Sequence, residues 1–63
     1  MERWIKIEEV KIGDRIDWTA GTDKEEERGP DEFDIYSVEI DNGETTLNDM
    51  YVAPNGMAIL RVS

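Results

Sequence analysis

The dipeptide Asn42-Gly43 constrains the fold of this chain more than any other feature, because strand-forming residues flank it on both sides. Asn and Gly tolerate the positive φ angles of a two-residue type I′ turn, so the dipeptide predicts a tight β-hairpin. The preceding segment, residues 33–41, is rich in β-branched and aromatic residues, which favour strands. The resulting register predicts that Val38 pairs with Leu47 on one face of the hairpin.

The apolar positions change phase within residues 33–41. Phe33 and Ile35 share one face, whereas Tyr36 and Val38 share the other. A side-chain period of two cannot change in this way inside a regular strand. The pattern therefore predicts a bulge or sharp bend near Ile35, of the kind that lets a short sheet curl over.

Further short strands are expected on both sides of this hairpin. Residues 3–7 and 16–20 alternate apolar and polar types, and a Gly-Asp turn pair lies between them. The sequence Pro-Asn-Gly at residues 54–56 favours another turn, and we expect residues 50–53 and 57–62 to pair across it as a second hairpin. Residues 57–62 are apolar on both faces, which is typical of a central strand.

These signals predict an all-β protein. The chain has 63 residues and no cysteine, so one small core must form without disulfides or thiolate metal sites. We expect a single domain over residues 1–63, built as a small five-stranded antiparallel barrel, SH3-like or OB-like, with one long acidic loop at residues 21–32.

Neither a signal peptide nor a membrane span is expected. No basic segment with an apolar run follows Met1, and no stretch of ~18 consecutive apolar residues occurs. We therefore expect a soluble protein in the cytoplasm, either of its own cell or of a host cell.

The residue types present leave little room for catalysis. Histidine and cysteine are both absent, which removes the usual general base, the thiol nucleophile and the commonest transition-metal ligand. A carboxylate pair is the remaining option, but so short a chain has no room for a large cleft. The acidic segments also lack the ligand spacing of a helix-flanked calcium loop. We expect a protein that is not an enzyme and that holds no cofactor or metal ion.

Carboxylates dominate the charge of the chain. Sixteen Asp and Glu residues against seven Lys and Arg give a net charge of -9, so we expect neither nucleic acid nor a membrane to bind directly. Most charge runs are solvated loops that keep a protein soluble, but a long loop in a small domain also often carries function. The candidate partner-binding carboxylates are Asp23, Glu25, Glu26, Glu27, Asp31, Glu32 and Asp34, and the acidity extends to Asp14, Asp17, Glu39, Asp41 and Glu44.

Three of the five aromatic residues are candidate anchors for a partner. Trp18 and Phe33 lie in alternating apolar rows, so we expect both in the core. Trp4, Tyr36 and Tyr51 are expected to expose an edge, which suits a hot spot in a protein interface.

Residues 51–54, Tyr-Val-Ala-Pro, resemble the tetrapeptide near the end of SH3 domains whose Tyr and Pro help to form a groove for proline-rich ligands. The acidic segment before Phe33 is similar to an acidic loop of that family. The resemblance implies an SH3-like barrel that binds a peptide. It covers four residues, and the Ala-Leu-Tyr-Asp-Tyr motif and the paired groove tryptophans of the family have no counterpart here.

Two hypotheses of function follow. In the first, the chain covers the basic surface of a nucleic-acid-binding protein as an inhibitor or nucleic-acid mimic, like the small acidic proteins that phages direct against host restriction or CRISPR systems. In the second, it is an SH3-like adaptor or subunit domain that holds a peptide or a neighbouring chain through exposed aromatics. A piece of a larger assembly, acidic only for solubility, is a plainer third interpretation. A homodimer is expected if residues 57–62 are not covered within the monomer.

Overall fold

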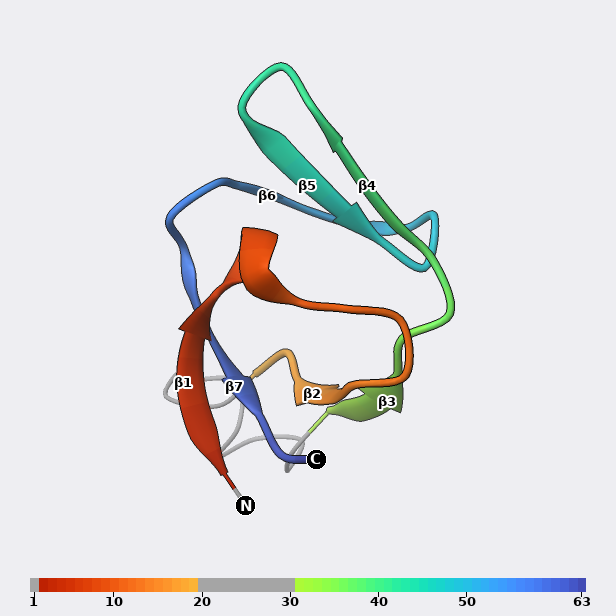
Figure 1. Ribbon diagram of the computed structural model, residues 1–63, viewed down its shortest axis with the longest axis vertical. Helices are drawn as coiled ribbons and strands as arrows, with labels where there is room; N and C mark the ends of the chain where they lie inside the picture. The colour runs from red at the N-terminus through yellow and green to blue at the C-terminus, as the bar shows by residue number, and fades with distance from the viewer. Residues whose placement is uncertain (1, 20–30) are drawn as a thin grey trace.

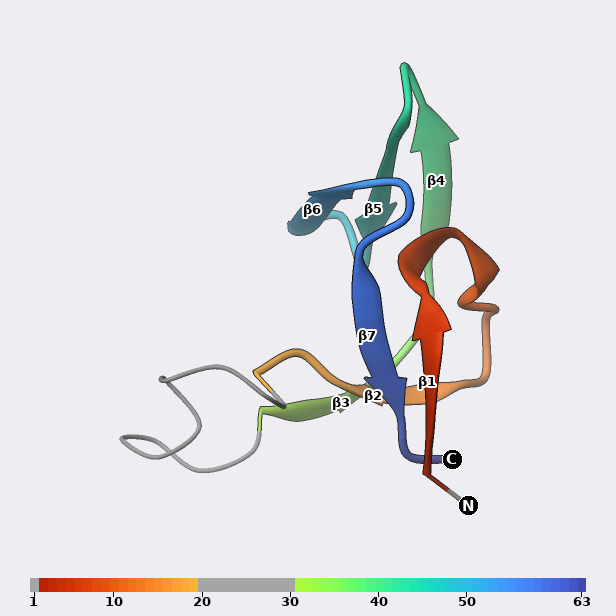
Figure 2. The same ribbon diagram turned by 90° about the vertical axis from the view of Figure 1, so that its left-hand side faces the viewer.

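The computed structural model describes residues 2–19 and 31–63, which form two antiparallel β-sheets (Figure 1). Sheet A has the strand order β1-β7-β2-β3, and sheet B has the order β4-β5-β6. The strands are β1 (Arg3–Lys6), β2 (Arg15–Asp17), β3 (Glu32–Asp34), β4 (Val38–Asp41), β5 (Glu44–Leu47), β6 (Tyr51–Pro54) and β7 (Ala58–Arg61). The tip of the β4–β5 hairpin projects away from sheet A in both views (Figures 1 and 2).

The expected five-stranded barrel differs from this arrangement. Seven strands of three or four residues form two sheets, and no closed barrel is present within residues 2–19 and 31–63. The chain changes sheet after β3 and again after β6. The strands are short, and each ends where the chain changes sheet. No single bent strand therefore takes part in both sheets, as it would in a barrel.

The hairpin at Asn42-Gly43 is confirmed with its predicted register. Asn42 has φ 52° and Gly43 has φ 76°, as a type I′ turn requires. Val38 lies opposite Leu47 in the β4–β5 ladder, and the ladder ends at the turn. The turn therefore fixes which residues of β4 and β5 lie opposite each other, and so which side chains share a face.

The predicted bend near Ile35 is also confirmed, because residues 35–37 leave sheet A and lead into sheet B. One side chain holds this crossing in place. Asn48 is 5% exposed, and its Oδ1 accepts hydrogen bonds from the backbone N–H groups of Tyr36, at 2.8 Å, and Ser37, at 3.3 Å. Its Nδ2 donates to the carbonyl of Asp34 at 2.8 Å. Asn48 thus supplies partners to backbone groups that no longer have a neighbouring strand.

The predicted second hairpin is wrong. Residues 54–56 do form a turn, but β6 and β7 on either side of it belong to different sheets. Instead β6 pairs with β5 across a turn at Asn48 and Asp49, which have φ 52° and 61°. Asn and Asp are the non-glycine residues best able to adopt such angles, so this tight turn needs no glycine.

Strand β7 is central, as predicted, because it pairs with both β1 and β2. Its Ile59 is 2% exposed. On the other face of β7, Ala58 is exposed and Leu60 is half-buried, so the homodimer stays a prediction.

In the described part of the chain, the buried hydrophobic side chains are all aliphatic. These core residues are Ile5, Ile7, Val10, Ile16, Ile35, Leu47, Ala53 and Ile59. Trp18 and Phe33 are only partly buried against this core, in contrast to the expectation. Both rings contact Tyr51 of sheet B, Phe33 stacked at 4.2 Å between ring centroids and Trp18 tilted at 4.9 Å. The aromatic rings therefore join the two sheets at the border of the core, where each keeps a solvated edge.

A single 3-10 turn, η1 (Ile7–Glu9), follows β1. Its Ile7 is fully buried, and the backbone N–H of Ile7 donates to the carbonyl of Met57 at 2.8 Å. Across residues 2–19 and 31–63, no helix has the length and apolar character needed to cross a membrane.

The Asn48 side chain can be tested by two substitutions. We expect Asn48→Ala to lower the free energy of unfolding by about 2–4 kcal/mol, because it orphans buried backbone groups and strains a positive φ. Asn48→Gly removes the same hydrogen bonds but tolerates the φ angle, so it should cost less than Asn48→Ala. Urea unfolding of both variants measures these losses. A loss below about 0.5 kcal/mol for Asn48→Ala, the range of ordinary surface substitutions, would contradict the role given to Asn48.

Candidate functional site

The structure separates the predicted partner-binding carboxylates into two groups. Asp23, Glu25, Glu26 and Glu27 lie outside the described residues. Glu32 and Asp34 lie in β3, one of the two edge strands of sheet A, and Asp31 directly precedes it. The backbone N–H of Asp31 donates to Asp17 Oδ1 at 3.2 Å, so this part of the acidic segment is tied to the sheet.

Two of these carboxylates are already neutralised within the chain. Arg15 Nε donates to Glu32 Oε1 at 3.3 Å, and Arg15 Nη1 donates to Asp34 Oδ1 at 3.1 Å. The hydrogen bonds to Asp34 and Glu32 raise the pKa of Arg15 above its ordinary value. Glu32 and Asp34 therefore belong to a surface ion-pair network with Arg15 and are not free charges.

The other acidic residues of the N-terminal half have local structural roles. Asp17 is 4% exposed, and its Oδ1 accepts hydrogen bonds from the backbone N–H of Thr19, at 3.0 Å, and from that of Asp31. Asp14 Oδ2 accepts from the backbone N–H of Lys11 at 2.9 Å and closes the turn before β2. Neither carboxylate belongs to an open acidic face, contrary to the expectation for Asp14 and Asp17.

The three candidate aromatic anchors have different surroundings. Trp4 is 54% exposed on β1, and Tyr36 is 63% exposed on the crossing between the sheets. The hydroxyl of Tyr36 donates to the carbonyl of Asn48 at 3.2 Å. Tyr51 is half-buried between Phe33 and Trp18. The structure therefore leaves Trp4 and Tyr36 accessible, while Tyr51 packs between the sheets.

A different set of carboxylates gathers on the outer face of sheet B. In the ladder, Asp41 lies opposite Glu44, and Glu39 lies two positions from Asp41 on the same strand. Successive side chains alternate between the faces of a strand, so all three share the face opposite to Leu47 and Thr45, which are fully buried. All three are exposed, and none of their carboxylate groups has a hydrogen bond or ion pair within residues 2–19 and 31–63. We call Glu39, Asp41 and Glu44 the sheet B carboxylates.

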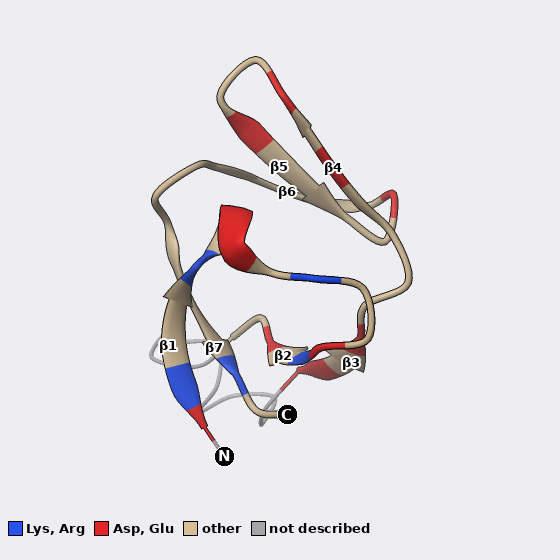
Figure 3. Cartoon of the chain, in the orientation of Figure 1, with Lys and Arg blue, Asp and Glu red and all other residues tan. Residues whose placement is uncertain are grey.

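Charge is divided between the two sheets (Figure 3). No Lys or Arg occurs between residues 31 and 60, a stretch that includes the whole of sheet B. The cations in the described part of the chain lie in residues 3–15 and at Arg61. Exposed acidic side chains therefore cover sheet B without a compensating charge from the same sheet.

The sheet B carboxylates lie side by side along one face of the β4–β5 hairpin. Like charges directly opposite each other on neighbouring strands are destabilising, and Asp41 and Glu44 are such a pair. Within the described ranges, no three carboxylates lie close enough to hold a metal ion. This geometry suits separate contacts with several cationic groups, such as Lys and Arg side chains on a partner surface.

Comparison with protein-family models, with curated proteins and with solved structures found no match to this chain.

One carboxylate of the N-terminal half connects two distant segments. The backbone N–H of Gly56 donates to Glu8 Oε1 at 2.7 Å, and this hydrogen bond lowers the pKa of Glu8 below its ordinary value of 4.5. Glu8 thereby fastens the turn between β6 and β7 to η1. A group whose pKa is lower in the folded state contributes stability above its unfolded pKa and loses that contribution as the pH falls through the folded value.

We therefore expect Glu8→Gln to unfold at a lower urea concentration than the parent protein at neutral pH, with a difference that shrinks as the pH falls below 4.5. Urea midpoints measured between neutral and acidic pH test this. Glu2→Gln is the matched control, because Glu2 is exposed and has no hydrogen bond within the described part of the chain. A Glu8→Gln difference that does not depend on pH would exclude the charge as its cause.

Proposed function

We propose that this protein is a non-enzymatic binding protein that covers a basic protein surface with the sheet B carboxylates. The observation that supports this most is the run from residue 31 to residue 60, which holds seven carboxylates and no cation. Within it, Glu39, Asp41 and Glu44 are exposed on one face without a partner in the described residues. Their mutual repulsion is relieved when Lys or Arg side chains of a partner approach.

The partner class we propose is a nucleic-acid-binding protein, and the mode of action is competition with its nucleic acid. Side chains at alternate positions of a strand are spaced by about 6.6 Å, so the sheet presents negative charges at regular intervals along a rigid surface. A surface that grips phosphates through Arg and Lys recognises carboxylates by the same charge-assisted hydrogen bonds. This is the chemistry of an inhibitor or nucleic-acid mimic of the phage anti-restriction or anti-CRISPR type. Such a protein works in the cytoplasm that holds its target.

The alternative is an SH3-like adaptor or subunit domain that holds a peptide or neighbouring chain through exposed aromatics. The observation that favours it is the exposure of Trp4 and Tyr36, at 54% and 63%. Large aromatic side chains accessible on a small domain are typical interface anchors.

A matched pair of triple variants tests the first proposal. We expect Glu39→Gln with Asp41→Asn and Glu44→Gln to weaken binding about 10- to 100-fold, because each exposed ion pair contributes ~0.5–1 kcal/mol. Glu25→Gln with Glu26→Gln and Glu27→Gln changes the net charge by the same amount and tests the acidic loop. To identify the partner, proteins of the source cell are captured at low salt on the immobilised chain. The partner is the captured protein that added duplex DNA releases. Its affinity is then measured by calorimetry at two salt concentrations.

The outcomes separate the two proposals. Loss of binding in the sheet B variant with little loss in the loop variant supports the sheet as the contact surface. An affinity that neither triple variant nor added salt changes would overturn the first proposal. Loss of binding in Trp4→Ala or Tyr36→Ala, with both triple variants unaffected, would establish the adaptor instead.

A further inference from the structure

Two arginines lie directly opposite each other on neighbouring strands of sheet A. In the β1–β7 ladder, Arg3 pairs with Arg61, and Ile5 pairs with Ile59. Residues two apart on a strand share a face, so both arginines lie on the face that carries the buried Ile5 and Ile59. Like charges placed directly opposite repel each other, so this pair has an electrostatic cost within the free protein.

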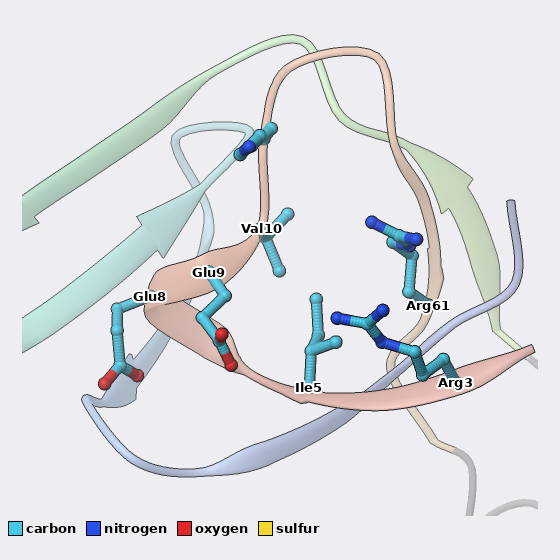
Figure 4. A pocket seen from close by; sticks show the side chains of 7 residues that line it. Arg3, Ile5, Glu8, Glu9, Val10 and Arg61 are labelled. Atoms are coloured by element: carbon cyan, nitrogen blue, oxygen red, sulfur yellow. The ribbon is translucent and has the colours of Figure 1, made fainter.

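A pocket of about 280 Å³ opens where these two side chains lie (Figure 4). Its wall includes the apolar side chains of Ile5 and Val10, both of them buried in the core, and the cationic Lys11. The guanidinium groups of Arg3 and Arg61 lie on the same side of the pocket, beside Ile5 (Figure 4). The volume is close to the lower limit of small-molecule sites, about 300 Å³. The cavity therefore accommodates a small ligand and not a macromolecule.

The cations of this pocket lack acidic partners. Within residues 2–19 and 31–63, only Arg15 forms ion pairs with Asp or Glu. Arg61 Nε is buried and has no hydrogen-bond partner. A buried charged donor without an acceptor is rare in folded proteins, because the group has lost its water without compensation. Arg61, which lines the pocket, thus carries an unpaired buried donor beside a positively charged wall.

The acidic residues at the pocket do not fill this role. Glu8 Oε1 accepts the N–H of Gly56 at 2.7 Å, and Glu9 Oε1 accepts the backbone N–H of Lys6 at 2.9 Å. Both carboxylates lie toward the other end of the pocket from the two guanidinium groups (Figure 4). Their negative charge closes that end to anions, so an anion is restricted to the arginine end.

We propose that this pocket binds a small oxyanion, a carboxylate or phosphate, between Arg3 and Arg61. Guanidinium groups bind planar and tetrahedral oxyanions through paired N–H donors, and the anion offsets the repulsion between the two arginines. A short apolar body on the ligand would rest against Ile5 and Val10. This site lies on sheet A and does not depend on the function proposed for sheet B.

The test uses inorganic phosphate and butyrate as probes, titrated at constant ionic strength with chloride as the reference anion. We expect at least one probe to cause saturable shifts of the Arg61 Nε–H resonance and the Ile5 and Val10 methyl resonances, with a Kd on the order of 1 mM. Saturation by both probes identifies a general oxyanion site. Saturation by butyrate alone identifies a carboxylate site with an apolar wall, and saturation by phosphate alone identifies a phosphate site.

Three variants make the result specific. Arg3→Gln and Arg61→Gln should each weaken binding about tenfold or more, because each removes charge-assisted hydrogen bonds. Arg3→Gln is tested beside Arg61→Gln because Arg61 lies in an inner strand of sheet A, where a substitution can unfold the sheet. Lys6→Gln is the matched control, since it removes the same charge from the opposite face of β1 and should leave the affinity unchanged. Shifts that do not saturate with either probe, or that persist in both arginine variants, would overturn the proposal.

Discussion

The fold depends on the hydrogen bonds that Asn48 makes to the crossing between β3 and β4. A chain of 63 residues without disulfides has little core with which to force a strand out of one sheet and into another. The backbone between β3 and β4 has no neighbouring strand, so its N–H and C=O groups need hydrogen-bond partners from elsewhere. Asn48 provides both an acceptor and a donor, and it comes from the turn that returns β5 to β6. One side chain therefore fixes the place where sheet B begins and the place where its second turn occurs.

The direction of sheet B follows from the same crossing. With Val38 and Leu47 turned toward the core, the alternation of the strand leaves Glu39 no position except the outer face. Sheet A, in contrast, contains the described arginines, and one of them, Arg15, forms ion pairs with the carboxylates of β3. The division of charge between the sheets thus follows from the absence of Lys and Arg between residues 31 and 60, because the topology gathers residues 38–54 of that stretch into sheet B.

Local features of the sequence predicted part of this structure. The Asn42-Gly43 turn and its register could be predicted because a type I′ turn depends on two residues and determines the pairing beside it. The predicted register places Asp41 opposite Glu44. Glu39 lies two positions farther from the turn on the same face, so the acidic face could have been predicted from the sequence. The phase change near Ile35 located the crossing, because a strand cannot reverse its faces without a break.

Non-local features could not be predicted in this way. Residues 54–56 have the composition of a hairpin turn, but β7 after them joins sheet A, and Gly56 in that turn donates to Glu8, 48 positions away. Asp17 was expected on the surface, yet it is buried where two backbone N–H groups need an acceptor. The pairing of Arg3 with Arg61 joins the two ends of the described chain, and no periodicity indicates it.

Within residues 2–19 and 31–63, no further strand pairs with either edge of sheet B, and its carboxylates also affect what those edges can do. Strand β4 forms one edge and carries Glu39 and Asp41, while β6 forms the other and ends at Pro54, which has no N–H to offer. Pairing of β4 with the β4 of a second molecule would bring these carboxylates to within about 5 Å of their copies. Their repulsion opposes the strand-to-strand assembly to which short, open sheets are prone. The repulsion between these carboxylates therefore keeps copies of this sheet apart.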